Sequence, residues 1–223
     1  MSIESNIKKI KDEIASICND CGRNPEDVNL MAVTKTVDVD AVLEAIEAGI
    51  TDVGENKPQE LARKYEVIGD KVNWHLIGTL QTNKVKYIID KVTMIHSLDR
   101  EALCEEIQKR AEKIDRVIDC LVQVNISKEE SKHGFEVEEI DEVFNSLKDY
   151  PHVKVRGLMM MAPHIESSET EKYFKMTQEL LQRLQKDYPM YQLDQLSMGM
   201  SNDYHEALKH GSTMIRIGSA LFK

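Results

Sequence analysis

The chain has 223 residues, of which 41% are hydrophobic and 30% are charged, and its formal net charge is −10 at pH 7. This length is sufficient to bury a full core, as one large domain or two small ones. The acidic balance argues against a nucleic-acid surface, and no apolar stretch approaches the roughly 18 residues of a membrane span. Residues 1–5 lack the apolar core of a signal peptide, so we expect a cytoplasmic protein with no membrane contact.

Isoleucines recur at spacings of three and four residues near the N-terminus, which predicts an amphipathic helix over residues 1–21. Gly22 suits a left-handed cap at its end. Cys18 and Cys21 have C-x-x-C spacing, but no second pair of soft ligands follows. We therefore expect no metal site.

Apolar runs and amphipathic segments then alternate along the chain. The predicted strands are 30–35, 51–56, 72–78, 93–97, 117–125, 153–162, 196–198 and 214–218. The predicted helices are 38–48, one starting at Pro58, 84–89, 101–113, one ending near Leu147, 168–186 and 203–210. Ser168 and Glu171 form a capping-box pattern that predicts the start of the long helix over 168–186.

This alternation predicts an α/β fold, a single TIM-type (β/α)8 barrel that makes residues 1–223 one domain. A doubly wound open sheet is the fallback, although no G-x-G-x-x-G follows the first strand. Only five residues follow Gly218, so we expect the last helix to be missing. The extra helix over residues 1–21 is then expected to pack on the barrel in its place.

Lys35 ends the first predicted strand. A lysine at the carboxyl end of a buried strand can aim its amine into a site, and burial disfavours its charged form. Neutral lysines of this kind form Schiff bases with aldehydes and ketones. From this segment alone, a surface lysine just past a strand explains the residue equally simply.

Two glycine-containing loops follow the seventh and eighth strands, where barrels of this class commonly bind phosphate. Ser201 lies in the first loop, which leads into a helix, and Gly218 with Ser219 forms the second. Backbone N–H groups and hydroxyls at such positions suit a phosphate group. Either loop alone is explained by ordinary turn chemistry, but both loops together, opposite Lys35, predict a phosphate site.

A reactive amine and a phosphate cradle fit pyridoxal 5′-phosphate, an aldehyde that carries a phosphate. Arg216 lies two residues before Gly218, so its guanidinium could meet the pyridine nitrogen. A permanent cation there would keep this nitrogen unprotonated and weaken the ring as an electron sink. The alternative role for Arg216 is an ion pair within the barrel.

Six segments together resemble the pyridoxal-phosphate homeostasis protein family, the single-domain relatives of bacterial alanine racemase. They are 31–35, 54–56, 74–81, 123–125 with 130–132, 196–201 and 215–219, in the family's order. The resemblance implies a barrel with pyridoxal phosphate on Lys35, phosphate contacts from Ser201, Gly218 and Ser219, and Arg216 facing the pyridine nitrogen. It also implies Asn56 as a neighbour of the cofactor. Lys57-Pro58 departs from the family pattern and puts contacts at the rim of the site in doubt.

The resemblance implies a protein that binds pyridoxal phosphate for cofactor homeostasis, rather than an enzyme. Racemisation in the two-domain relatives needs a second base from a C-terminal β-domain, and we expect no such domain here, and therefore no catalytic residue. We expect a monomer whose partners are pyridoxal phosphate and apoenzymes that depend on it. Three alternatives stay open: a weak amino-acid racemase with His75 or His205 as substitute base, a cofactor-free Schiff-base aldolase, and a regulatory protein that uses residues 128–132 and its acidic helices as surfaces.

Overall fold

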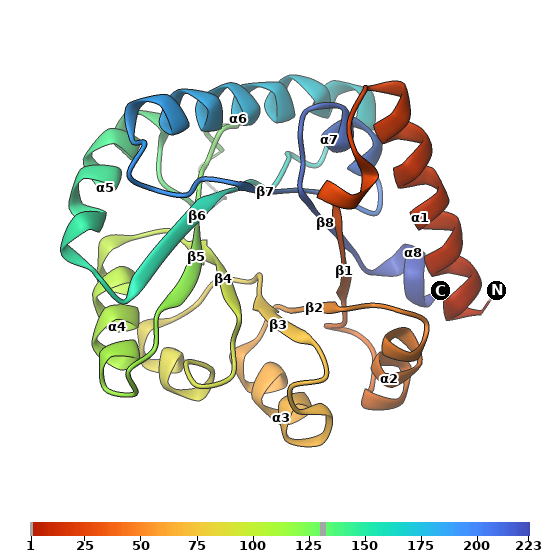
Figure 1. Ribbon diagram of the computed structural model, residues 1–223, viewed down its shortest axis with the longest axis horizontal. Helices are drawn as coiled ribbons and strands as arrows, with labels where there is room; N and C mark the ends of the chain where they lie inside the picture. The colour runs from red at the N-terminus through yellow and green to blue at the C-terminus, as the bar shows by residue number, and fades with distance from the viewer. Residues whose placement is uncertain (1, 130–132) are drawn as a thin grey trace.

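Eight parallel strands close into a barrel surrounded by helices in the computed structural model, which describes residues 2–129 and 133–223 (Figure 1). The strands are β1 (Asn29–Val33), β2 (Asp52–Glu55), β3 (Asn73–Leu76), β4 (Met94–Leu98), β5 (Ile118–Gln123), β6 (Val153–Met159), β7 (Gln195–Met200) and β8 (Met214–Ile217). Each strand pairs with its neighbour in sequence, and β8 closes the barrel against β1. The predicted (β/α)8 fold is confirmed.

Helices follow the strands around the outside of the barrel. The α-helices are α1 (Ile3–Asp20), α2 (Val39–Glu47), α3 (Pro58–Ile68), α4 (Glu101–Glu112), α5 (Ile140–Ser146), α6 (Ser167–Asp187), α7 (Tyr204–Lys209) and α8 (Ser219–Phe222). The short 3-10 helices are η1 (Pro25–Asp27), η2 (Thr82–Tyr87), η3 (Val137–Glu139) and η4 (Leu147–Asp149). Over the described residues, none of the helices combines the length and apolarity needed to cross a membrane.

Helix α1 covers the region beside α7 and α8, as predicted, with both chain ends on that side (Figure 1). Its isoleucine face is buried, and the buried Asn6 side chain donates to the carbonyl oxygen of Leu221 at 2.9 Å. Glu13 accepts hydrogen bonds from Tyr204 Oη and from His205 Nε2. Helix α1 is therefore fixed to the last two helices of the barrel.

Several details of the predicted elements are wrong. Helix α6 begins at Ser167, and its N-cap residue Glu166 makes no side-chain capping bond, so the Ser168 capping box is not formed. The predicted helix over 84–89 is the 3-10 helix η2, starting at Thr82. Strand β6 ends three residues early, and β7 continues to Met200. The last helix, which we expected to be missing, is present as the single turn α8.

Candidate functional site

The residues predicted to bind a cofactor lie at the carboxyl ends of the strands, the end of a (β/α)8 barrel that carries the active site in enzymes of this fold. Lys35 follows β1, Asn56 follows β2, Ser201 follows β7, and Gly218 follows β8. Because β7 pairs with β8, β8 with β1, and β1 with β2, all four strand ends are adjacent.

Ser201 and Gly218 are brought together across the ends of β7 and β8. The backbone N–H of Gly218 donates to Ser201 Oγ at 3.4 Å. A Cβ atom at Gly218 would lie 3.3 Å from the carbonyl oxygen of Val33, so this loop passes close to the end of β1. The two predicted phosphate loops therefore form one surface, half-buried at Ser201 and Gly218 and exposed at Ser219.

Local geometry around Gly199 fixes the first of these loops. Gly199 has a φ of +92°, and a Cβ atom there would lie 2.7 Å from Ala207 Cβ on α7. Only glycine accommodates both the left-handed backbone and this close approach. Beyond it, Asp203 Oδ1 accepts a hydrogen bond from the backbone N–H of Met200 at 2.6 Å. This turn presents Ser201 toward Gly218.

Lys35 is exposed at the mouth of the barrel, so our expectation that its amine is buried is wrong. The strand ends at Val33, and the chain turns at residues 35–36 before α2. The residue before it, Thr34, is fully buried and is held from two sides. Thr34 Oγ1 donates to Glu55 Oε1 at 2.6 Å, and Lys64 Nζ donates to the carbonyl oxygen of Thr34 at 2.6 Å. The backbone that carries Lys35 is therefore fixed although its side chain is free in solvent.

Lys64 and Glu55 form a buried ion pair that the sequence analysis missed. Their side chains are 1% and 0% exposed, and Lys64 Nζ lies 2.6 Å from Glu55 Oε1. Glu55 Oε2 is also buried and has no hydrogen-bond partner among the described residues. Lys64 lies in the predicted helix that starts at Pro58, and a lysine at a core-facing helical position is a signal for a buried partner.

Arg216 is buried in the barrel interior, on β8, with 5% of its surface exposed. Its Nη1 donates to Ser197 Oγ at 2.6 Å, and its Nη2 donates to the carbonyl oxygen of Met160 at 2.9 Å. Burial lowers the pKa of Arg216 to about 10, while the charge of Asp203 acts in the opposite direction. The guanidinium therefore stays a cation at neutral pH. These two hydrogen bonds take the place of the ion pair considered as its alternative role.

His75, considered as a substitute base, lies inside the barrel rather than at its mouth. It is 2% exposed, with Nε2 2.8 Å from Asp52 Oδ1 and Nδ1 3.0 Å from His96 Nε2. His205 is on the exposed surface of α7 and contacts Glu13 of α1. His75 is therefore enclosed in the barrel interior, and His205 lies on the outer surface.

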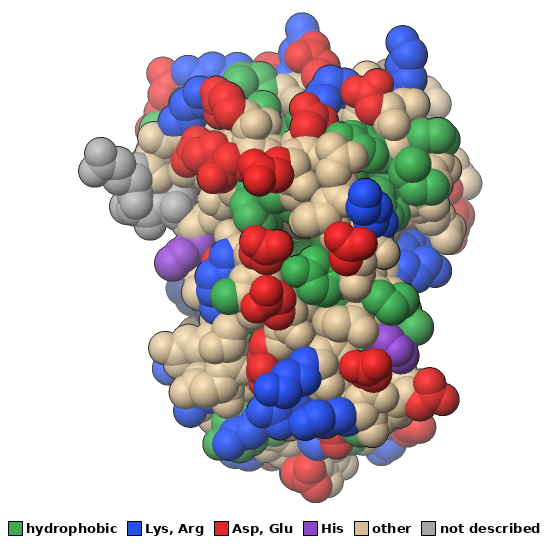
Figure 2. Space-filling view, turned by 90° about the vertical axis from the view of Figure 1, so that its left-hand side faces the viewer, with side chains coloured by type: hydrophobic (Ala, Val, Ile, Leu, Met, Phe, Trp, Pro, Cys, Tyr) green, Lys and Arg blue, Asp and Glu red, His purple; other side chains and the backbone are tan. Residues whose placement is uncertain are grey.

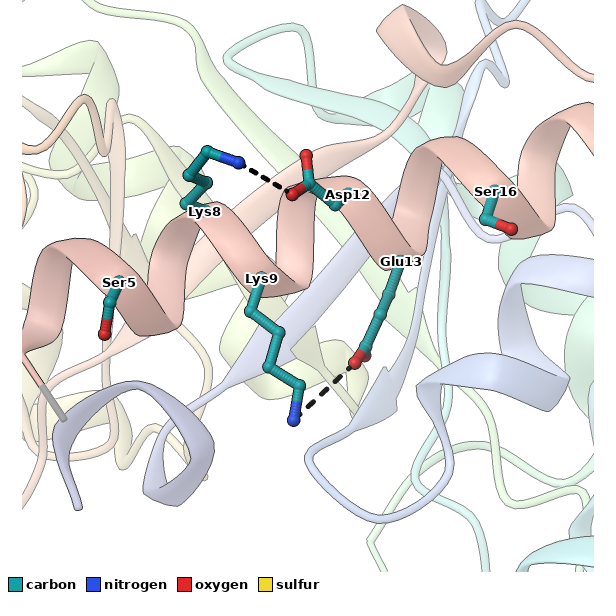
Figure 3. A pocket seen from close by; sticks show the side chains of 6 residues that line it. All are labelled: Ser5, Lys8, Lys9, Asp12, Glu13 and Ser16. Carbon is teal, nitrogen blue, oxygen red and sulfur yellow. Dashed lines mark hydrogen bonds and ion pairs between the residues drawn. The ribbon is translucent and has the colours of Figure 1, made fainter.

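Two other surfaces carry no comparable arrangement. A shallow depression on α1 is lined by Ser5, Lys8, Lys9, Asp12, Glu13 and Ser16, all from one helix. Figure 3 shows its Lys8–Asp12 and Lys9–Glu13 pairs, at 3.1 and 3.9 Å, which are ordinary i,i+4 ion pairs of a helix surface. The face around α4 and α5 has acidic and basic side chains interspersed over it (Figure 2). Residues 130–132, part of both the resemblance and the considered partner surface, lie outside the described residues.

Comparison with known proteins gives one consistent result. Residues 5–223 match the family described as alanine racemase, N-terminal domain. The chain is 43% identical, over 97% of its length and 95% of the relative's, to the pyridoxal phosphate homeostasis protein of Aquifex aeolicus. The corresponding protein of Escherichia coli is 35% identical over 99% of this chain and 95% of its own.

Solved structures agree with these sequence matches. PipY of Synechococcus elongatus, in a structure described as having pyridoxal phosphate bound, is 33% identical with a TM-score of 0.84, over 96% of this chain and all of PipY. Alanine racemase of Corynebacterium glutamicum shares the fold, with a TM-score of 0.72 at 16% identity, over 96% of this chain and 60% of the racemase.

The fold and the sequence match define a barrel of the alanine racemase N-terminal domain class. Within this class, the chain belongs to the pyridoxal phosphate homeostasis protein family, and the resemblance stated from its motifs is confirmed.

Proposed function

We propose that this protein binds pyridoxal 5′-phosphate at the mouth of the barrel, as a Schiff base with Lys35, and contributes to cofactor homeostasis without robust catalytic turnover. The observation that carries the proposal is the buried Arg216 cation beside the Ser201–Gly218 contact, next to the strand end that leads to Lys35. The PipY structure with pyridoxal phosphate bound, at 33% identity, supports it.

The residues present fit the cofactor. We assign the Gly218 backbone N–H and the Ser201 hydroxyl, which contact each other at 3.4 Å, as donors for a phosphate, with Ser219 at the rim. Arg216 supplies a cation with a fixed orientation for the pyridine nitrogen. When bound, the group supplies an aldehyde and an electron-withdrawing ring. Asn56, half-buried at the end of β2, is proposed as its neighbour.

The same residues favour holding the cofactor over turnover. A permanently protonated guanidinium at the pyridine nitrogen weakens the ring as an electron sink. His75 is engaged with Asp52 and His96 inside the barrel, and His205 is engaged with Glu13 on the outer surface. Racemisation requires a base on each face of the substrate carbon, and neither of these histidines supports that role.

Binding is tested by titrating the purified protein with pyridoxal phosphate and following the visible absorption. The wild type and Lys57→Ala, which removes an exposed lysine next to Asn56, are expected to develop the band of a Schiff base. Lys35→Ala is expected not to develop it. A band of equal strength in Lys35→Ala would place the Schiff base elsewhere.

Absence of turnover is tested with single-enantiomer amino acids and chiral analysis of the products. The loaded protein is expected to leave the enantiomers unchanged and to restore the activity of an added apoenzyme that requires pyridoxal phosphate. Sustained conversion to the mirror form would instead establish a racemase, and it would contradict the homeostasis proposal. We also propose that the protein acts as a monomer in the cytoplasm.

A further inference from the structure

A continuous chain of hydrogen bonds crosses the barrel interior from β2 to β8. Its five members are each at most 5% exposed, and they are, in order, Asp52, His75, His96, Ser197 and Arg216. The successive distances are 2.8 Å from Asp52 Oδ1 to His75 Nε2, 3.0 Å from His75 Nδ1 to His96 Nε2, 2.9 Å from His96 Nδ1 to Ser197 Oγ, and 2.6 Å from Ser197 Oγ to Arg216 Nη1.

With both imidazole rings neutral, the two ends of the chain determine the direction of every hydrogen bond. Arg216 has only donors, so Ser197 Oγ accepts from it. The ionised Asp52 has only acceptors, so His75 Nε2–H donates to it. A neutral His75 must then accept at Nδ1 from His96 Nε2–H, and His96 accepts at Nδ1 from the Ser197 hydroxyl. Each neutral ring is thereby assigned the Nε2–H tautomer.

Surrounding charges favour this arrangement. Burial lowers the pKa of His96 well below its usual range, and the charges of His75 and Arg216 act in the same direction. Burial would raise the pKa of Asp52, but hydrogen bonds and charge from His75, with Thr51 and Asn29, hold it at about 2. Asp52 Oδ2 also accepts from Thr51 Oγ1, and Asp203 is the acidic group that acts on Arg216. A carboxylate and a guanidinium therefore lie at opposite ends of the two imidazole rings, and the lowered pKa keeps His96 neutral.

We infer that Asp52, His75, His96 and Ser197 are positioning residues, which hold the Arg216 guanidinium in one orientation and with one hydrogen-bond polarity toward the pyridine nitrogen. The inference rests on the proposed function for its target, because the ring nitrogen belongs to the bound cofactor. The chain itself is a property of the protein alone. Ser197 is its decisive member, since its hydroxyl is the link that joins the histidines to Arg216.

The direction of the chain is tested on the cofactor-free protein, independently of the proposed function. Long-range proton–nitrogen NMR correlations distinguish the two neutral histidine tautomers, and His75→Gln and His96→Gln assign the signals. We expect both His75 and His96 as neutral Nε2–H tautomers at neutral pH. An Nδ1–H tautomer or an imidazolium at either residue would overturn the inference.

The effect on Arg216 is tested with three serine variants of the loaded protein. Ser197→Ala removes the link, whereas Ser197→Thr keeps a hydroxyl at the same position. Ser97→Ala is the matched control, because Ser97 is fully buried on β4 and its hydroxyl has no partner within the described part of the chain. The readouts are the absorption maximum of the bound cofactor across pH and its affinity.

We expect Ser197→Ala to displace the absorption maximum, to change its pH dependence and to weaken cofactor affinity roughly tenfold, as for a lost hydrogen bond to a charged group. Ser197→Thr and Ser97→Ala should retain the wild-type spectrum. A wild-type spectrum and affinity in Ser197→Ala would show that Ser197 only packs the barrel. If the wild type binds no pyridoxal phosphate, the proposed function fails, while the NMR result still decides the direction of the chain.

Discussion

At the scale of single residues, the candidate site combines groups that differ in how firmly the fold holds them. Arg216 is buried and held by two hydrogen bonds, whereas Lys35 is exposed beside a rigid, buried Thr34. A rigid backbone beneath a free amine suits a group that must reach an incoming aldehyde. The sequence predicted these residues from their positions at strand ends, but it could not predict the exposure of Lys35, which depends on where the chain turns after Val33.

Ser201→Ala and Gly218→Val are expected to weaken binding of pyridoxal phosphate. The first removes a hydroxyl, and the loss of about one hydrogen bond should reduce affinity by roughly three- to tenfold. The second adds a side chain whose Cβ would lie 3.3 Å from the Val33 carbonyl, so it should displace the loop and reduce affinity further. Equilibrium titration measures the affinity of both variants for pyridoxal phosphate, with Ser168→Ala on the exposed surface of α6 as control. Unchanged affinities would show that the phosphate loops are misplaced.

Asp52 predicts a specific loss of stability in acid. Its pKa is lowered from 3.8 to about 2, where burial acts to raise it and His75 outweighs that effect. A carboxyl with a lowered pKa stabilises the fold above its unfolded pKa, and this contribution is lost as the pH falls from about 4 toward 2. The contribution at neutral pH is on the order of 2 kcal/mol.

Urea unfolding of Asp52→Asn is the measurement for this effect. The variant should be less stable than the wild type at neutral pH, and the difference should shrink as the pH is lowered. Asp70→Asn, an exposed carboxyl at the end of α3, should show no such convergence. Parallel curves for wild type and Asp52→Asn would contradict the assignment.

At the scale of elements, periodicity predicted most of the barrel, because hydrophobic spacing reports local structure and burial. The isoleucine face of α1 is an example, and Gly22 after it has the predicted left-handed backbone. The errors have physical reasons. Strand β6 stops at Met159 although apolar residues continue past it, and Ser168 matched a capping pattern one residue inside the actual helix. Contacts between distant elements, such as Lys64 with Glu55 and His96 with Ser197, leave no periodic signal.

The Lys64–Glu55 pair should couple α3 to the ends of β1 and β2. Lys64→Met leaves the buried Glu55 carboxylate without its cation, and such losses typically cost about 3–5 kcal/mol. The double variant Lys64→Met/Glu55→Leu removes both charges and should recover part of this stability. Urea unfolding measures the stability of both variants. The control is Arg63→Ala, which breaks only the exposed pair with Glu60 and should have little effect. A Lys64→Met variant as stable as the wild type would contradict this role.

At the scale of the whole molecule, the barrel closes through β1 and β8, and α1 covers the region next to α7 and α8 (Figure 1). This closure places the end of the first strand beside the end of the last. Lys35 and Gly218, far apart in sequence, thereby belong to one surface. The order of strands in a (β/α)8 barrel implies this proximity, so the outline of the site was predictable once the fold was recognised.

The central claim, that Lys35 holds pyridoxal phosphate through a Schiff base, is tested most directly by reduction with borohydride. Freshly purified protein is loaded with pyridoxal phosphate, its visible spectrum is recorded, and it is then reduced and digested for peptide mass spectrometry. The account predicts loss of the visible band on reduction and a stable pyridoxyl modification on Lys35 alone. Modification of another lysine in place of Lys35, or a protein that takes up no pyridoxal phosphate, would contradict it.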